Sequence, residues 1–393
     1  MARSVLGLRA LAAGLLGLSL GGCLGGGSLV PPSAVLAGPP ATQGDVIGKG
    51  PVRVALILPM TGQGQASVAA QSLRNAAELA LGEFPNAEIS ISVKDDQGTP
   101  EGARAAATEA LAEGAELVVG PLFAGSVQAA GQVARSAGRP VLAFSTDTSV
   151  ASPGVYLLSF LPQAEVERIV DHAAAQGRRS FAALIPDTTY GSVVEAQFRE
   201  AAAERGVRVV AVERYPAGQP QVGVQRIESL IAGPSAQADA LFLPENADGI
   251  AAMGQALQAV GFEPGRVKPL GTGVWNEPRV FATAALQGGW FAAPDNRGFN
   301  GFAARYRARF GSDPTRLATL SYDAVSLAAA LARAQGSQRY SEAVLTNPAG
   351  FAGADGVFRF RRDGTNERAL AVQEIRNGGA TTVSPAPRAL PAT

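Results

Sequence analysis

The alternation of two hydrophobic periodicities from Pro51 onward constrains the fold most strongly. Short apolar runs typical of buried strands, beginning with VRVALIL, each precede a segment whose apolar residues recur at helical spacing. This β-α-β-α order predicts an α/β fold with a parallel sheet and helices on both of its faces. The first series predicts strands at 52–58, 88–94, 116–120 and 140–144, and helices at 66–81, 101–113 and 126–135.

A second series of the same kind follows the apolar segment at 157–160. It predicts strands at 180–186, 207–213, 239–244 and 267–271, and helices at 164–176, 193–205, 222–231 and 249–260. Helices at 299–310 and 317–333 and strands at 356–360 and 369–375 complete the pattern. We therefore expect two doubly wound, Rossmann-like lobes. Such sheets bind ligands at the C-terminal ends of their strands, so two facing lobes form a hinged cleft.

The N-terminus has the features of a secreted, lipid-modified precursor. Arg3 and Arg9 precede a short apolar core, and small residues then lead to Cys23, as in a bacterial lipobox. An ordinary secretory signal with an incidental cysteine is the alternative. We expect residues 1–22 to be a lipoprotein signal peptide, Cys23 the lipidation site, and 23–50 and 379–393 a disordered tether and tail. We assign residues 51–160 and 295–345 to an N-terminal lobe, and 161–294 and 346–378 to a C-terminal lobe.

Charge and residue counts argue against several classes of function. Lys plus Arg and Asp plus Glu both number 33, so no basic excess points to a nucleic-acid partner. The only histidine is His172 and the only cysteine is Cys23, which leaves no transition-metal cluster and no intramolecular disulfide. No serine lies in a G-x-S-x-G motif, and Gly48-Lys49 lacks the spacing of a phosphate-binding loop. We expect a binding protein without an enzymatic site, metal or cofactor.

Small polar residues and two aromatic residues follow the predicted strands. Hydroxyl groups at these ends can bind a carboxylate, and an aromatic ring can close over an apolar group. Turn formation and helix capping are the alternative role for each residue taken singly. The candidate cleft residues are Ser145, Thr146, Asp147, Tyr190, Glu245 and Trp275.

Several segments together resemble the type I periplasmic binding proteins of the leucine/isoleucine/valine-binding class. The resemblance spans residues 51–376 and is carried by VRVALILPMTGQGQ, KDDQGTPEGARAAATEALAEGAELVVGPL, GRPVLAFSTD and PDTTYGSVVEAQFREAAAERG. Within this class, GPLFAGSVQAAG and AFSTDTSVASPGVYLLSFLPQAEVERIV resemble the penicillin-binding-protein activator lipoproteins. That resemblance implies a non-catalytic periplasmic lipoprotein, anchored to the inner leaflet of the outer membrane, whose partner is a peptidoglycan synthase. The alternative is a receptor that delivers a branched-chain amino acid or related small polar ligand to an ABC permease.

The pattern of amino-acid receptors in this class is only partly present. Ser145, Thr146 and Tyr190 match positions that contact the substrate in such receptors, whereas Asp147 and Ala124 stand where hydroxyl groups are expected. The resemblance places an acidic partner for the substrate ammonium in residues 271–275, and GTGVW has no carboxylate. Glu245 and Asp147 are the candidate substitutes. An ammonium group without a partner in a closed cleft carries a large desolvation cost, so the departures weigh against an amino-acid ligand.

Overall fold

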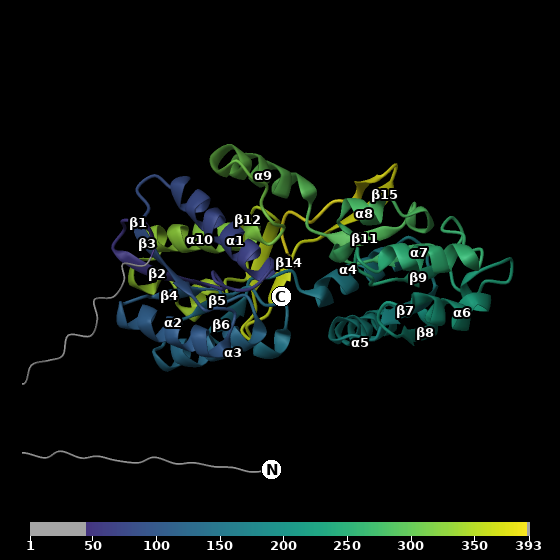
Figure 1. Cartoon of the computed structure of the whole chain (residues 1–393), viewed down its shortest axis with the longest axis horizontal. Helices are drawn as coiled ribbons and strands as arrows, with labels where there is room; N and C mark the ends of the chain where they lie inside the picture. Colours follow the sequence, from purple (N-terminus) through teal and green to yellow (C-terminus); the bar gives the residue numbers. More distant parts are fainter. Residues whose placement is uncertain (1–44, 391–393) are drawn as a thin grey trace, which may run out of the picture. The chain divides into compact units, whose positions relative to one another are not determined.

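The computed structural model describes residues 45–390, so the predicted signal peptide and Cys23 lie outside the described part. Two sheets and their helices form the lobes that the sequence predicts (Figure 1). Strand and helix boundaries agree closely with the hydrophobic pattern; β7 (Ser180–Pro186), for example, coincides with the predicted strand. The fold class is confirmed as mixed α/β with two parallel-sheet lobes.

The N-terminal lobe contains a six-stranded sheet in the order β1-β3-β2-β4-β5-β6. All neighbours from β3 to β6 are parallel, and β1 pairs antiparallel with β3 at the edge. The strands are β1 (Val46–Gly48), β2 (Val52–Leu58), β3 (Ile89–Asp95), β4 (Leu117–Val119), β5 (Val141–Ala143) and β6 (Val155–Leu157). The connecting helices are α1 (Gln65–Gly82), α2 (Pro100–Ala112) and α3 (Ala124–Ser136).

The C-terminal lobe repeats the winding in a seven-stranded sheet, β16-β15-β11-β10-β9-β7-β8. The five strands from β11 to β8 are parallel, and β15 and β16 extend the sheet antiparallel. The remaining strands are β8 (Arg208–Tyr215), β9 (Ala240–Phe242), β10 (Lys268–Gly271), β11 (Trp290–Ala293), β15 (Ala371–Arg376) and β16 (Gly379–Ser384). The helices are α4 (Pro162–Ala175), α5 (Thr189–Glu204), α6 (Pro220–Ile231), α7 (Ile250–Ala259) and α8 (Pro278–Phe281).

After β11 the chain returns to the N-terminal lobe. It forms α9 (Asn296–Phe310), α10 (Ala318–Ala334), α11 (Glu342–Leu345) and a small antiparallel sheet of β12 (Phe351–Gly353), β13 (Gly356–Phe360) and β14 (Asn366–Arg368). Helix α10 packs against α1, and Phe358 and Phe360 of β13 belong to the same buried core. The chain then crosses to the C-terminal lobe at 369–370, after earlier crossings at 158–161 and 294–295.

Each sheet is covered on both faces, as its continuous apolar strands require. In the N-terminal lobe, α1 and α10 cover one face and α2 and α3 cover the other (Figure 1). In the C-terminal lobe, α6 and α7 bury one face and α4 and α5 bury the opposite one. None of the helices within residues 45–390 has the length and hydrophobicity needed to cross a membrane.

The structure differs from the predicted tether, the predicted tail and one predicted lobe segment. The predicted tether includes Val46–Gly48, which forms β1 because its backbone pairs with β3. The predicted disordered tail includes Gly379–Ser384, which forms β16 because β15 offers it an unpaired edge. Residues 346–378 do not all follow the C-terminal lobe: β12 to β14 pack on the N-terminal core, and only β15 joins the C-terminal sheet.

Polar contacts tie the first crossing to the third. The backbone oxygen of Ser159 accepts hydrogen bonds from Asn366 Nδ2 at 2.8 Å and Arg368 Nε at 3.4 Å. The ring of Phe160 lies 4.7 Å from the Arg316 guanidinium and 4.9 Å from that of Arg368. The crossing at 158–161 is therefore held by cation–π contacts as well as by hydrogen bonds.

Candidate functional site

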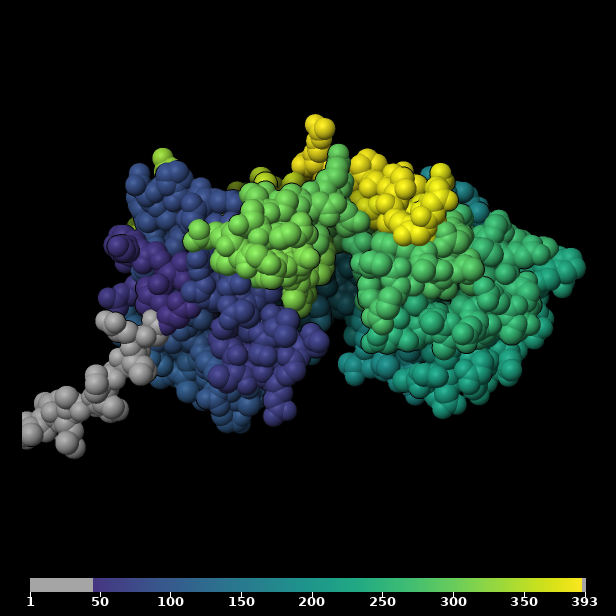
Figure 2. Space-filling model, turned by 45° about the horizontal axis from the view of Figure 1, so that its top comes forward, coloured from purple at the N-terminus to yellow at the C-terminus, as the bar shows by residue number. Residues whose placement is uncertain are grey.

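The strand orders place one ligand crevice in each lobe. In both parallel sheets the chain first adds a strand on one side of the initial strand and then continues on the other side, which opens a crevice at the carboxyl ends of two strands. These strands are β2 and β4 in the N-terminal lobe and β7 and β9 in the C-terminal lobe. Figure 2 shows the surface hollowed between the N-terminal lobe, in blue, and the C-terminal lobe, in teal and green.

The N-terminal crevice is mainly apolar. Met60 and Leu122 follow β2 and β4 and pack partly exposed on the core, and the Phe123 side chain is 41% exposed. The nearby polar groups bond to one another: Thr61 Oγ1 donates to Asp95 Oδ2 at 2.6 Å, and the Thr61 N–H donates to Asp95 Oδ1 at 3.2 Å. This wall offers an apolar surface, because its carboxylate is already engaged.

Ser145, Thr146 and Asp147 follow β5 and serve mainly to form a turn. The buried Ser145 Oγ accepts a hydrogen bond from the Asp147 N–H at 3.1 Å. The exposed Asp147 caps a short 3₁₀ helix by accepting from the Ser149 N–H at 2.9 Å. Thr146 is exposed. Turn chemistry therefore accounts for Ser145 and Asp147, and Thr146 is the member of the trio with a free hydroxyl among the described residues.

Tyr190 and Glu245 flank the C-terminal crevice. Tyr190 lies in the first turn of α5, directly after β7, and its hydroxyl lies 2.7 Å from Thr272 Oγ1 in a hydrogen bond. Glu245 follows β9 and is buried, and its Oε2 accepts from the Tyr215 hydroxyl at 2.6 Å. Burial, followed by the charge of Glu165, raises the pKa of Tyr190, so this phenol stays protonated.

Trp275 does not face the cleft, which corrects the prediction. Its side chain is fully buried in the core of the C-terminal lobe and lies beside Phe291. The reason is the space left by a glycine: a Cβ on Gly271 would lie 2.1 Å from the indole Cδ2. The indole ring therefore folds back over the end of β10.

Glu165 is a further candidate site residue, which does not follow any predicted strand. It lies in the first turn of α4 and is only 6% exposed, and its Oε2 accepts from the Gly273 N–H at 2.9 Å. Burial raises its pKa to about 8, although the Gly273 hydrogen bond and the Arg316 charge act in the opposite direction. A signal was present, because Glu165 occupies the apolar face of α4 together with Val166 and Ile169.

Glu165 supplies a carboxyl group to a loop that has none of its own. Residues 271–275 contain no acidic side chain, yet a Cβ on Gly273 would lie 2.5 Å from Glu165 Oε1. The carboxyl therefore occupies the space that a side chain at residue 273 would need. The C-terminal wall thus combines two buried carboxyl groups, Glu165 and Glu245, with the Tyr190–Thr272 pair.

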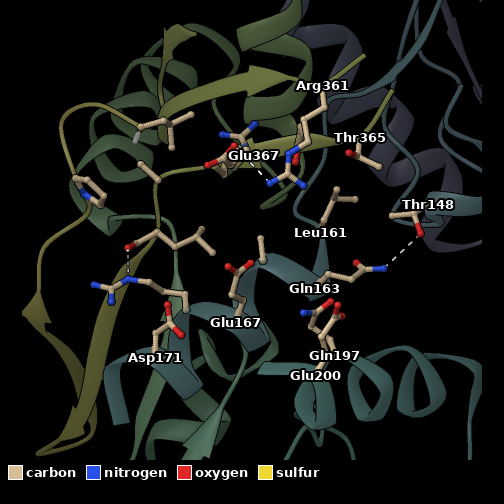
Figure 3. Close-up of a pocket in the computed structure, with 18 of the residues that line it drawn as sticks. Thr148, Leu161, Gln163, Glu167, Asp171, Gln197, Glu200, Arg361, Thr365 and Glu367 are labelled. Carbon is tan, nitrogen blue, oxygen red and sulfur yellow. Dashed lines mark hydrogen bonds and ion pairs between the residues drawn. The ribbon is translucent and has the colours of Figure 1, made fainter. Parts of the chain in front are cut away.

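A second cavity, of about 510 Å³, lies between α4, α5 and the 361–370 segment (Figure 3). Most of its polar groups bond within the protein. Gln163 Nε2 donates to Thr148 Oγ1 at 3.4 Å, and Arg361 pairs with Glu367 at 3.4 Å. Neither crevice-forming pair of strands ends there, so the wall around Glu165 is the stronger candidate site.

Comparisons with known proteins agree with this geometry. Residues 51–380 match the family model described as periplasmic binding protein. A search among curated protein sequences finds no match. A structure of a putative branched-chain amino acid ABC transporter from Rhodospirillum rubrum is 22% identical, with a TM-score of 0.74 over 84% of this chain and 99% of its own.

Two ligand-bound structures show the same fold at lower similarity. LivJ from Streptococcus pneumoniae, in complex with isoleucine, is 19% identical, with a TM-score of 0.61 over 86% of this chain and 100% of its own. A solute-binding protein from R. palustris, in complex with benzoate, is 19% identical, with a TM-score of 0.62 over 87% of this chain and 98% of its own. On the family match over residues 51–380, this chain belongs to the periplasmic binding proteins, and its two wound lobes have the same fold as these solved structures.

Proposed function

We propose that the protein is the solute-binding receptor of an ABC transporter and closes its two lobes over a small polar solute. The observation that carries this proposal is the C-terminal wall, where Glu245 is buried after β9 and Glu165 of α4 is buried against the loop after β10. Burying a carboxyl group costs free energy that a fold recovers only through a specific partner. Glu245 already accepts from the Tyr215 hydroxyl and the Asn246 N–H, whereas Glu165 accepts only from the Gly273 N–H among the described residues, so a bound solute provides the partner for Glu165.

The structural relatives support a receptor more than a regulator. Those described above include an amino-acid transport protein with isoleucine and a solute-binding protein with benzoate. Binding of a solute, rather than catalysis, is the role that we assign to this chain, with a membrane permease as its partner. We place the protein in the periplasm, in keeping with its family.

The activator function rests on the sequence resemblance alone. No contact or surface in residues 45–390 favours a peptidoglycan synthase, so the receptor function, our alternative at the sequence level, replaces it as the main proposal. Lipid attachment at Cys23 and anchoring at the outer membrane remain predictions, since that residue lies outside the described part of the chain.

Thermal unfolding with a panel of solutes tests the receptor function. A solute that binds only the folded state raises the free energy of unfolding, by about 2.7 kcal/mol at one hundred times its dissociation constant. We expect at least one amino acid or small carboxylate to raise the melting temperature. If none does, and the purified protein instead binds and stimulates a peptidoglycan synthase, the receptor proposal is wrong and the activator function is right.

A further inference from the structure

Aromatic rings and guanidinium groups alternate in a stack where the chain crosses between the lobes. The members, which we call the hinge stack, are in order Phe299, Arg316, Phe160, Arg368 and Phe358. The distances between guanidinium carbon and ring centroid along this order are 4.6, 4.7, 4.9 and 5.2 Å. Phe160 belongs to the first crossing, Phe299 follows the second crossing at the start of α9, and Arg368 immediately precedes the third. The hinge stack therefore joins residues in or beside all three crossings.

Arg368 is the member of the hinge stack that has the fewest hydrogen bonds for its burial. Its side chain is 2% exposed, and its Nε donates to the Ser159 backbone oxygen at 3.4 Å. Neither Nη1 nor Nη2 donates a hydrogen bond to any residue in the described part of the chain. A buried guanidinium in this state is held by its charge, through the Phe160 and Phe358 rings and through the nearest carboxylate.

Asp323 on α10 is that carboxylate. Its side chain is 1% exposed, and its Oδ2 lies 3.8 Å from Arg368 Nη1, beyond hydrogen-bond distance. Oδ1 accepts from the Ala354 N–H at 2.6 Å, whereas Oδ2 has no donor among the described residues. Arg316 is engaged elsewhere, because it donates two hydrogen bonds to Asp355, at 2.7 and 3.0 Å. Arg368 thus lies between a carboxylate that it does not reach and the ring of the first crossing.

We propose that Arg368 is a conformational switch in the hinge and that the ionisation of Asp323 sets its position. Ionised Asp323 attracts the guanidinium and draws it away from the Phe160 ring, which loosens the first crossing. Neutral Asp323 leaves the guanidinium to the aromatic rings and the Ser159 oxygen, which holds this crossing against the N-terminal lobe. The lobes of the solute-free protein then move more widely when Asp323 is ionised. This inference concerns the hinge and goes beyond the proposed receptor function.

The switch operates near neutral pH. Burial raises the pKa of Asp323 to about 7; the charges of Arg368 and Arg316 and the Ala354 N–H act against this rise, and the charge of Asp355 adds to it. These charged groups face Asp323 from β14 (Arg368), from the turn between β12 and β13 (Asp355) and from the segment ahead of α10 (Arg316). Arg368 keeps its charge throughout this range. We therefore expect wider lobe movement above pH 7 than below it.

Time-resolved energy transfer between two dyes, one on each lobe, tests the inference without any solute. The dyes attach to Ala105→Cys on α2 and Gln225→Cys on α6, both exposed, in the full chain carrying Cys23→Ser so that no third cysteine is labelled. Molecules whose inter-dye distance differs from the main one should become about threefold more frequent from pH 5.5 to 8.5, with a midpoint near pH 7. Phe160→Leu removes both guanidinium contacts of the ring and should raise that population about tenfold at either pH.

Three further variants separate the switch from other sources of pH dependence. Asp323→Asn keeps an oxygen that accepts from the Ala354 N–H but does not ionise, so it should show the pH 5.5 distribution at every pH. Phe310→Leu removes a ring at the end of α9 that Arg309 overlies at 5.8 Å, and it should behave like the wild type. Glu165→Gln removes another buried carboxyl with a raised pKa and should keep the wild-type pH dependence.

Four results would overturn the inference. They are a wild-type distribution that stays the same between pH 5.5 and 8.5, a pH dependence that persists in Asp323→Asn, its loss in Glu165→Gln, and equal distributions in Phe160→Leu and the wild type. None of these results bears on solute binding, so the receptor function stands or fails separately in the thermal unfolding test.

Discussion

The pH dependence of stability in the solute-free protein gives a direct test of the environment of Glu165. The folded state holds this carboxyl neutral up to about pH 8, whereas the unfolded chain ionises it above its ordinary value of 4.5. A raised folded pKa contributes stability that is complete below pH 4.5 and is lost as the pH rises towards 8. Each pH unit in this window removes about 1.4 kcal/mol from the free energy of unfolding.

Glu165→Gln removes this dependence, because an amide oxygen still accepts from the Gly273 N–H but does not ionise. Between pH 5.5 and 7.5 the free energy of unfolding of the variant should rise by about 2.5 kcal/mol relative to that of the wild type. This value follows from the folded and unfolded pKa values of Glu165 and the linkage relation. Urea denaturation at several pH values measures the difference. Asp323, whose pKa burial raises to about 7, adds a similar slope to both proteins and cancels in the comparison.

A matched control separates this effect from a general change of charge. Glu228→Gln removes an exposed carboxylate from the same lobe, and its free energy of unfolding should vary with pH as that of the wild type does. If the free energy of unfolding of Glu165→Gln also varies with pH as that of the wild type does, the Glu165 carboxyl is ionised in the folded protein, and the reasoning from burial is wrong.

Three further variants test other parts of the structure. Tyr190→Phe removes the hydroxyl that bonds to Thr272 and should lower solute affinity by about 1 kcal/mol in calorimetry; unchanged affinity would place Tyr190 outside the site. Gly364→Ala adds a Cβ at φ +89°, 2.3 Å from the Val155 oxygen, and should lower the free energy of unfolding by about 2 kcal/mol or more in urea; equal stability would contradict the close approach of the two backbones at this turn. Cys23→Ser should move the protein from membrane to soluble fractions, and continued membrane association would refute the predicted lipid attachment.

The alternating hydrophobic pattern predicted the two lobes because helices and buried strands leave different periodicities in the chain. Strand β13 (Gly356–Phe360) coincides with its predicted range, and α1 extends its prediction by one residue at each end. The edge strands β1 and β16 were not predicted. Strand β1 has only three residues, and β16 contains mainly small and polar residues. Each becomes a strand because it pairs antiparallel with an edge strand, β1 with β3 and β16 with β15.

The sequence by itself determined which residues follow the strands, and hence that Tyr190 and Glu245 belong to one crevice, because a parallel sheet brings its strand ends together. Only the tertiary structure decided how side chains turn at those ends. Gly271 leaves space that draws Trp275 into the core, and Gly273 leaves space that admits the carboxyl of Glu165 from another helix. These side-chain orientations depend on the space that residues from other elements leave free, and hydrophobic periodicity carries no information about that space.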